Sequence, residues 1–141
     1  MEHESTTPVE AISRRVREAR SRKGMTAQEL ADKLRASGVP WDRGTVTKLE
    51  TGRRQGVSVT EWLALARALD VAPVHLLIPL EDRALFQVTP NEALPAHRVR
   101  PWARGIVPLP GSDSRIFHTE VPLAELRAWS GEERPVPPQE A

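Results

Sequence analysis

Side chains able to hydrogen-bond to an anionic or polar partner gather in the segment WDRGTVTKLE, residues 41–50. Val46 and Leu49 stand at helical spacing and predict which side of this segment is buried. The opposite side then presents Arg43, Gly44, Thr47 and Lys48. Cationic groups one turn apart suit base edges or phosphate oxygens, and a glycine allows close backbone approach. The same pattern is typical of an ordinary solvated helix face, so the segment alone leaves both interpretations open.

Catalytic and metal-ligating patterns are missing from the sequence. The histidines stand far apart and without the spacing of a metal site, at His3, His75, His97 and His118. The chain has no cysteine, which excludes disulfides, thiol catalysis and Cys-ligated zinc. No phosphate-binding glycine loop and no nucleophile-elbow motif occurs. We therefore expect no catalytic residue, no metal site and no cofactor, and we do not expect an enzyme.

Basic residues concentrate in one block of the chain. The formal net charge is only +1, but residues 11–56 carry twelve basic and five acidic groups, a balance of +7. Residues 1–10, 57–80 and 81–141 have balances of −3, −1 and −2. The block suggests an anionic partner. No apolar run approaches the roughly 18 residues of a membrane span. The polar N-terminus lacks the character of a signal peptide, so we expect a cytoplasmic protein with no membrane partner.

Helix start signals place residues 41–50 inside a series of short helices. The pattern of a capping box occurs three times, at Thr7–Glu10, Thr26–Glu29 and Ser58–Glu61. Asp42 is a good N-cap, and a short fifth helix is predicted to open at Pro73. Gly24, Gly38 and Gly52 mark the ends of the first three helices. These signals predict five tightly turned helices, of which the fourth is strongly apolar and therefore central.

Several of these stretches together resemble the lambda-repressor/Cro-like (XRE-type) helix-turn-helix family. The similarity covers residues 11–78, and its most specific pieces are GMT at 24–26, QELA at 28–31, TVTKLE at 45–50 with Gly52, and LALARAL at 63–69. It implies a mainly α fold, a five-helix lambda-repressor-like DNA-binding domain. One departure lies between the second and third helices, where residues 35–40 add about five residues to the family's short turn. We expect a second helix longer by a turn and a wider bend at Gly38 and Pro40.

The resemblance also implies roles for individual residues. The third predicted helix would enter the major groove of double-stranded DNA, with base contacts from Arg43, Gly44, Thr47 and Lys48. DNA backbone contacts are implied for Thr45, Arg53, Arg54, Thr26 and Ala27. The family often carries Gln at the position of Ala27, so a contact there would use the backbone N–H. An ion pair between Arg20 and Glu50 is implied to be structural and outside the site.

Residues 81–141 have a different composition and hold nine of the 13 prolines. Short strands are predicted at 84–88 and 114–120, a helical turn at 95–102, and a last helix from Pro122 that carries Leu123, Leu126 and Trp129. The large apolar residues predict that 81–130 form a C-terminal extension that packs on the first domain or dimerises. We expect a flexible N-terminus over 1–7, the helix-turn-helix domain over 8–80 and a disordered tail over 131–141.

The sequence therefore predicts a regulator of transcription that binds double-stranded DNA sequence-specifically. The fold class is mainly α, a five-helix domain with a small Pro-rich C-terminal extension of short strands and a short helix. A homodimer would fit two half-sites about one DNA turn apart. The alternative is a protein-interaction module on the same fold, such as an antitoxin or adaptor subunit; an enzyme with its site in the C-terminal part is less well supported. The operator, the direction of regulation and any small-molecule effector do not follow from the sequence.

Overall fold

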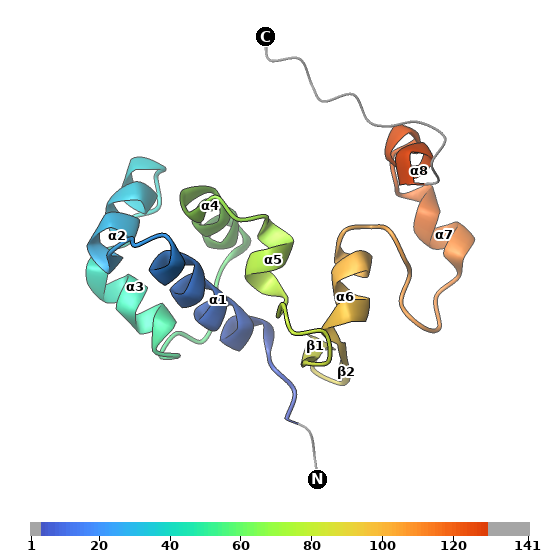
Figure 1. Cartoon of the computed structure of the whole chain (residues 1–141), viewed down its shortest axis with the longest axis horizontal. Helices are drawn as coiled ribbons and strands as arrows, with labels where there is room; N and C mark the ends of the chain where they lie inside the picture. Colours follow the sequence, from blue (N-terminus) through green and yellow to red (C-terminus); the bar gives the residue numbers. More distant parts are fainter. Residues whose placement is uncertain (1–3, 130–141) are drawn as a thin grey trace. The chain divides into compact units, whose positions relative to one another are not determined.

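The computed structural model describes residues 4–129 and is mainly helical, as predicted (Figure 1). Five helices come first: α1 (Pro8–Arg22), α2 (Ala27–Ala36), α3 (Arg43–Glu50), α4 (Val59–Leu69) and α5 (Pro73–Leu77). They are followed by strands β1 (Leu85–Thr89) and β2 (Glu92–Pro95), and then by α6 (Ala96–Ala103), α7 (Ser114–Thr119) and α8 (Leu123–Trp129). The five short helices predicted for the N-terminal part are thus confirmed.

Side-chain caps set where the first four helices begin. The capping residues are Thr7, Thr26, Asp42 and Ser58. The caps at Thr7 and Ser58 are complete capping boxes. At Thr26 the hydroxyl accepts the Glu29 N–H and donates to Glu29 Oε1, each at 3.1 Å. Because one such cap is worth about 1 kcal/mol, these short helices start at defined residues.

The core of the five-helix part is built from leucines on every helix after α1, with Ile12, Val16 and Ala19 contributed by α1 itself. α1 packs against α5 on one side and α3 on the other (Figure 1). Six leucines are completely buried: Leu30, Leu34, Leu49, Leu65, Leu69 and Leu76. Each buried leucine stabilises the fold by about 1.5–3 kcal/mol relative to an exposed one. α4 contacts α1, α2 and α5, which agrees with its predicted central position.

The connection from α2 to α3 is packed rather than loose. α2 ends at Ala36, and Gly38 turns the chain with a φ of 91°, a left-handed conformation that favours glycine. Val39 and Trp41 then enter the core with only 6% and 4% of their surface exposed. The Val39 N–H donates to the Leu34 carbonyl oxygen at 2.9 Å, which ties the bend back to α2. The predicted bend therefore brings two core residues into place directly before α3.

A small hairpin follows the five helices. β1 and β2 pair antiparallel, with Phe86 opposite Leu94. The strand predicted here is confirmed, whereas β2 was not predicted. On the other edge of β1, Thr6 forms a parallel bridge with Phe86. The Thr6 N–H donates to the Leu85 oxygen at 2.7 Å, and the Thr6 oxygen accepts the Gln87 N–H at 2.9 Å. A residue from the segment predicted to be a flexible N-terminus is thus paired with the sheet.

The chain divides into two compact units, one that runs to His97 and one that starts at Arg98. In the second unit the predicted last helix is confirmed as α8. The predicted helical turn at 95–102 corresponds to α6, which begins at Ala96, just before the division between the units. The second predicted strand, at 114–120, is wrong, because this segment forms α7. Asp113 caps α7 by accepting the Arg115 N–H at 2.8 Å, and this helix signal outweighs the alternating pattern that suggested a strand. The tail predicted at 131–141 lies outside the described residues.

Candidate nucleic-acid interface

The structure brings the predicted base-contact residues together on one face of α3. Asp42 caps the helix, because its Oδ1 accepts the N–H and the hydroxyl of Thr45 at 2.8 Å each. These two hydrogen bonds lower the pKa of the Asp42 carboxyl. Val46 and Leu49 are completely buried against the rest of the core. The side of α3 that remains exposed carries Arg43, Gly44, Thr47 and Lys48.

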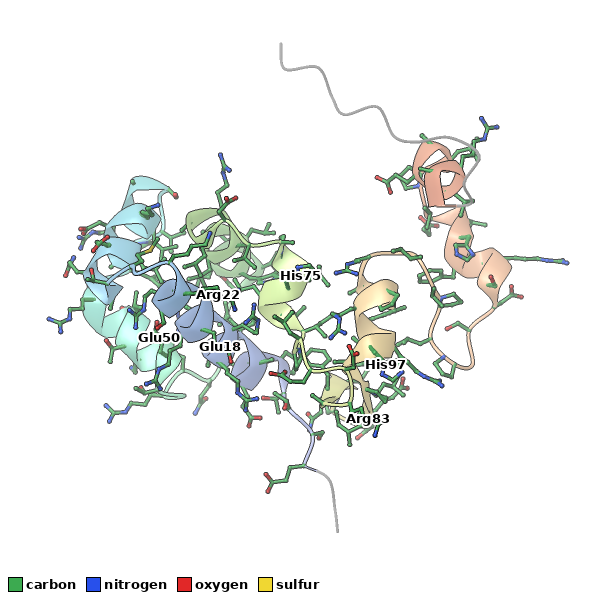
Figure 2. The ribbon with its side chains drawn as sticks, in the orientation of Figure 1. Glu18, Arg22, Glu50, His75, Arg83 and His97 are labelled. Atoms are coloured by element: carbon green, nitrogen blue, oxygen red, sulfur yellow. The ribbon has the colours of Figure 1, made fainter. Side chains whose placement is uncertain are left out.

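The acidic residue of α3 is neutralised from α1. Arg20 Nε and Nη2 donate to the two carboxylate oxygens of Glu50 at 2.6 and 2.9 Å, and Nη1 donates to the Met25 oxygen at 2.8 Å. Glu50 lies on the side of α3 that faces α1 (Figure 2). The hydrogen bond to Glu50 raises the pKa of Arg20, against a smaller opposing effect of burial. The implied ion pair is confirmed, and it removes the carboxylate from the exposed face.

Two open hollows border the exposed face of α3. The larger has a volume of about 650 Å³ and lies between α3, α1 and the start of α2. Its lining brings Thr26 and Ala27 opposite Arg43 and Thr47. The second hollow is lined by Arg43, Gly44, Thr47, Lys48, Thr51 and Arg53. The structure therefore brings most of the predicted base-contact and backbone-contact residues to one continuous surface around α3.

Sequence reasoning missed three residues that line the larger hollow: Arg17, Gln28 and Thr51. Arg17 lies on α1 three residues before Arg20, so the helical repeat brings both to the same side. That spacing is the signal that could have found it. Gln28 is exposed in the first turn of α2, where its amide donates to Asp32 at 2.9 Å. Thr51 is the C-cap of α3 and carried no separate signal.

The predicted backbone-contact residues differ in how much of each side chain is free. The hydroxyls of Thr26 and Thr45 are engaged in the caps of their own helices. Ala27 is half-buried, and its side chain is a methyl group, so the backbone N–H is the only hydrogen-bond donor that it offers. Arg53 is exposed just after Gly52.

Arg54 lies in the loop before α4, and its Nη1 and Nη2 donate to the carboxylate of Glu61 on α4. Its predicted role at the DNA backbone stays a prediction.

Comparison with known proteins decides the family. The model of the helix-turn-helix domain matches residues 11–77, the segment that holds α3 and both hollows. Residues 11–77 form a helix-turn-helix domain. The resemblance to lambda-repressor/Cro-like (XRE-type) regulators is thereby confirmed. In this helix-turn-helix domain, α2 and α3 are the first and second helices of the motif.

Two solved structures are similar to the chain. The restriction-modification controller protein C.AhdI from Aeromonas hydrophila is 37% identical, with 48% of this chain and 90% of that chain covered and a TM-score of 0.41. The hypothetical transcription factor NHTF from Neisseria is 29% identical, with 54% of this chain and 80% of that chain covered and a TM-score of 0.46. No curated protein sequence matches the chain significantly.

With this helix-turn-helix domain the chain is, at a general level, a DNA-binding regulator of transcription. Within residues 4–129, no helix is long and apolar enough to cross a membrane. The same described residues contain no group of three or more His, Cys, Asp or Glu side chains that could hold a metal ion.

Proposed function

We propose that this protein binds double-stranded DNA sequence-specifically through α3 and regulates transcription as a homodimer. The observation that carries this proposal is the charge of the exposed α3 face. Arg43 and Lys48 are exposed there, and Glu50, the one acidic residue of α3, is held by Arg20. A cationic helix face with its carboxylate withdrawn suits the negative potential of the major groove and its flanking phosphates.

In the proposed complex the N-terminal half of α3 reads base edges. Arg43 in the first turn has the planar fork that bonds guanine O6 and N7, and Lys48 one turn later reaches a second guanine or a phosphate. Thr47 offers a hydroxyl and a methyl group, the latter suited to thymine. Gly44 presents no side chain and allows the helix backbone to approach closely. Each good bidentate pair would discriminate against a wrong base by about 1–3 kcal/mol.

Backbone contacts would hold α3 in register on the duplex. The Ala27 N–H lies at the start of α2, where the helix dipole favours a phosphate. Arg53, exposed beyond the end of α3, and Thr45 are further proposed contacts, and Arg17 joins them because it lines the same hollow as Arg43. Each neutralised phosphate should contribute about −0.9 to the slope of log affinity against log salt. A homodimer would place two α3 helices in successive major grooves, about 34 Å apart.

The deciding experiment is selection of bound sequences from a random pool of double-stranded DNA. Wild type and Arg43→Ala would be compared with Arg83→Ala as the control. Arg83 is an exposed arginine beside β1, at the opposite end of the first compact unit from α3 (Figure 2). We expect two spaced half-sites for wild type and for Arg83→Ala. Arg43→Ala should lose preference at one base step of each half-site.

The proposal is rejected if protein shown to be folded by circular dichroism enriches no sequence at low salt. That outcome would favour a helix-turn-helix used for protein interaction. If Arg43→Ala selects the full wild-type motif, only the assignment of a base contact to Arg43 is rejected. The proposal that the protein binds DNA would stand.

A further inference from the structure

Trp41, Arg54 and Glu61 form a closed cluster beside α3. The Trp41 indole is buried, and its Nε1 donates to Glu61 Oε2 at 2.8 Å. Arg54 Nη1 and Nη2 donate to Glu61 Oε2 and Oε1 at 3.1 and 3.3 Å. The Arg54 guanidinium lies 4.6 Å from the centre of the Trp41 ring, in a cation–π contact. Each of the three side chains therefore contacts the other two.

The cluster joins three segments that are separate in the sequence. Trp41 directly precedes Asp42, the N-cap of α3, and Arg54 lies in the loop that leaves the C-terminal end of α3. Glu61 is in the first turn of α4, where its Oε1 also accepts the Ser58 N–H at 2.8 Å. The start of α3, the loop after α3 and the start of α4 are thus tied through one carboxylate.

Glu61 accepts four hydrogen bonds, two on each carboxylate oxygen, from Ser58, Arg54 and Trp41. Burial alone would raise the pKa of Glu61, but these hydrogen bonds and the charge of Arg54 outweigh it and hold the pKa below its usual value. The carboxylate is therefore the charged centre around which the two other side chains are arranged.

We propose that Trp41, Arg54 and Glu61 are positioning residues of the DNA interface, which fix the start of α3 and the following loop so that Arg43 and Arg53 meet the duplex in one register. This inference rests on the proposed DNA binding. It gives the lengthened α2–α3 connection a role, because that connection supplies Trp41. It also assigns Arg54 a function other than the phosphate contact implied by the family resemblance.

The environment of Arg54 favours positioning over phosphate binding. Both terminal nitrogens of its guanidinium are committed to Glu61, and one face of the group is covered by Trp41. The side chains of Arg54 and Glu61 are only 23% and 18% exposed. A phosphate that captured Arg54 would leave the Glu61 carboxylate beside the indole without its cation, which is unfavourable. Arg53, the neighbouring residue, is exposed and lines the hollow beside α3.

Short helices gain most from such anchoring. α3 has eight residues, and its C-terminal end is already held by the Arg20–Glu50 pair. The Trp41 cluster supplies the corresponding anchor at the N-terminal end, next to Arg43. A bidentate arginine contact requires close geometric alignment with guanine, so a small displacement at this end should weaken specific binding more than non-specific binding.

The test compares Arg54→Ala, Arg54→Lys and Trp41→Phe with the matched control Arg53→Ala. The probes are the duplex that wild type selects from a random pool and a duplex of scrambled sequence. Dissociation constants are measured by fluorescence anisotropy over a series of salt concentrations. Circular dichroism melts fix a temperature at which every variant is folded, so that lost stability is not mistaken for lost binding.

We expect Arg53→Ala to reduce the magnitude of the salt slope by about 0.9 and to weaken both probes similarly. Arg54→Ala and Trp41→Phe should keep the wild-type slope while the selected duplex binds roughly ten-fold more weakly, the scale of one base contact. The scrambled duplex should change little. Arg54→Lys should behave like Arg54→Ala, because an ammonium group cannot reproduce the planar fork and the stacking on Trp41.

Three outcomes would overturn the inference. A salt slope reduced by about 0.9 in Arg54→Ala and restored in Arg54→Lys would make Arg54 a phosphate contact. Melting temperatures that fall while the ratio of the two affinities stays at the wild-type value would make the cluster purely structural. A folded wild type that binds neither duplex would overturn the proposed function and this inference with it, whereas the first two outcomes leave the proposed function standing.

Discussion

Replacing Arg20 with methionine should leave the buried Glu50 carboxylate of the helix-turn-helix domain without its cationic partner. The Glu50 side chain is only 8% exposed, and Arg20 supplies both of the charged hydrogen bonds described above, at 2.6 and 2.9 Å. Removal of one partner from a buried pair costs about 3–5 kcal/mol, because the remaining charge is left uncompensated. Arg20 itself is 20% exposed, so water partly compensates and we expect a loss near the lower limit, about 3 kcal/mol.

The loss is measured by urea unfolding, followed by circular dichroism. A loss of 3 kcal/mol corresponds to a fall in Tm of roughly 12–24 °C for a cooperative unit of 60–100 residues. The double variant Arg20→Met/Glu50→Leu removes both charges and replaces them by apolar groups. Such replacements are often neutral, so the double variant should be more stable than Arg20→Met alone. The coupling free energy between the two positions then follows from a double-mutant cycle with Glu50→Leu.

Two results would refute this reasoning. The first is an Arg20→Met protein within about 1 kcal/mol of wild type, the scale of an exposed pair. The second is a double variant whose loss equals the sum of the two single losses, which would mean that the two side chains do not interact. If the reasoning holds, Arg20→Met loses DNA binding at warm temperatures through unfolding and recovers it on cooling, although Arg20 contacts no DNA in the proposed complex.

Three further changes test other parts of the structure. Gly44→Ala should stabilise the fold by up to about 1 kcal/mol, because a Cβ there meets only Asp42 Oδ1 at 3.4 Å. The same change should weaken binding to the selected duplex. The melting temperature should therefore rise while the affinity measured by anisotropy falls. Glu61→Gln should be destabilising at neutral pH. The pKa of Glu61 is lowered in the folded state, so the wild type loses the stability contributed by this carboxylate as the pH falls through that pKa. The difference in urea midpoint between wild type and Glu61→Gln should therefore shrink in acid. A difference independent of pH would contradict this. Leu69→Ala, at a completely buried position, should cost about 2–5 kcal/mol in urea unfolding, and a loss below 1 kcal/mol would show that the site collapses.

The five helices could be predicted because their start signals are local. A cap such as Asp42 or Ser58 acts on an N–H three residues later, so the sequence alone contains both partners. The buried face of α3 could be predicted in the same way, because Val46 and Leu49 stand at helical spacing within the helix itself. The exposed face that carries Arg43 and Lys48 is then determined by exclusion.

The features that could not be predicted depend on partners far along the chain. Arg54 was placed at the DNA backbone because its neighbour Arg53 and the family pattern suggested it, while its actual contacts lie with Trp41 and Glu61, 13 and seven positions away. β2 has four residues and no strong strand pattern, so its pairing with β1 decides its conformation. α7 is the exception, because its start signal is local: Asp113 is an N-cap of the same kind as Asp42.

Counting charges along the sequence locates the basic block but cannot show which charges cancel. Three of its five acidic residues are bound by arginines, in the pairs Arg15–Glu18, Arg35–Asp32 and Arg20–Glu50. Asp42, a fourth, directs its Oδ1 to the cap of α3. The charges of the arginines in these pairs are balanced within the chain, so the surplus positive charge lies on other side chains. Arg17, Arg43, Lys48 and Arg53 are among them, and all four line the hollows beside α3. The internal pairs therefore leave this face cationic, although the chain as a whole is nearly neutral, and a phosphate backbone responds to that local field rather than to the net charge.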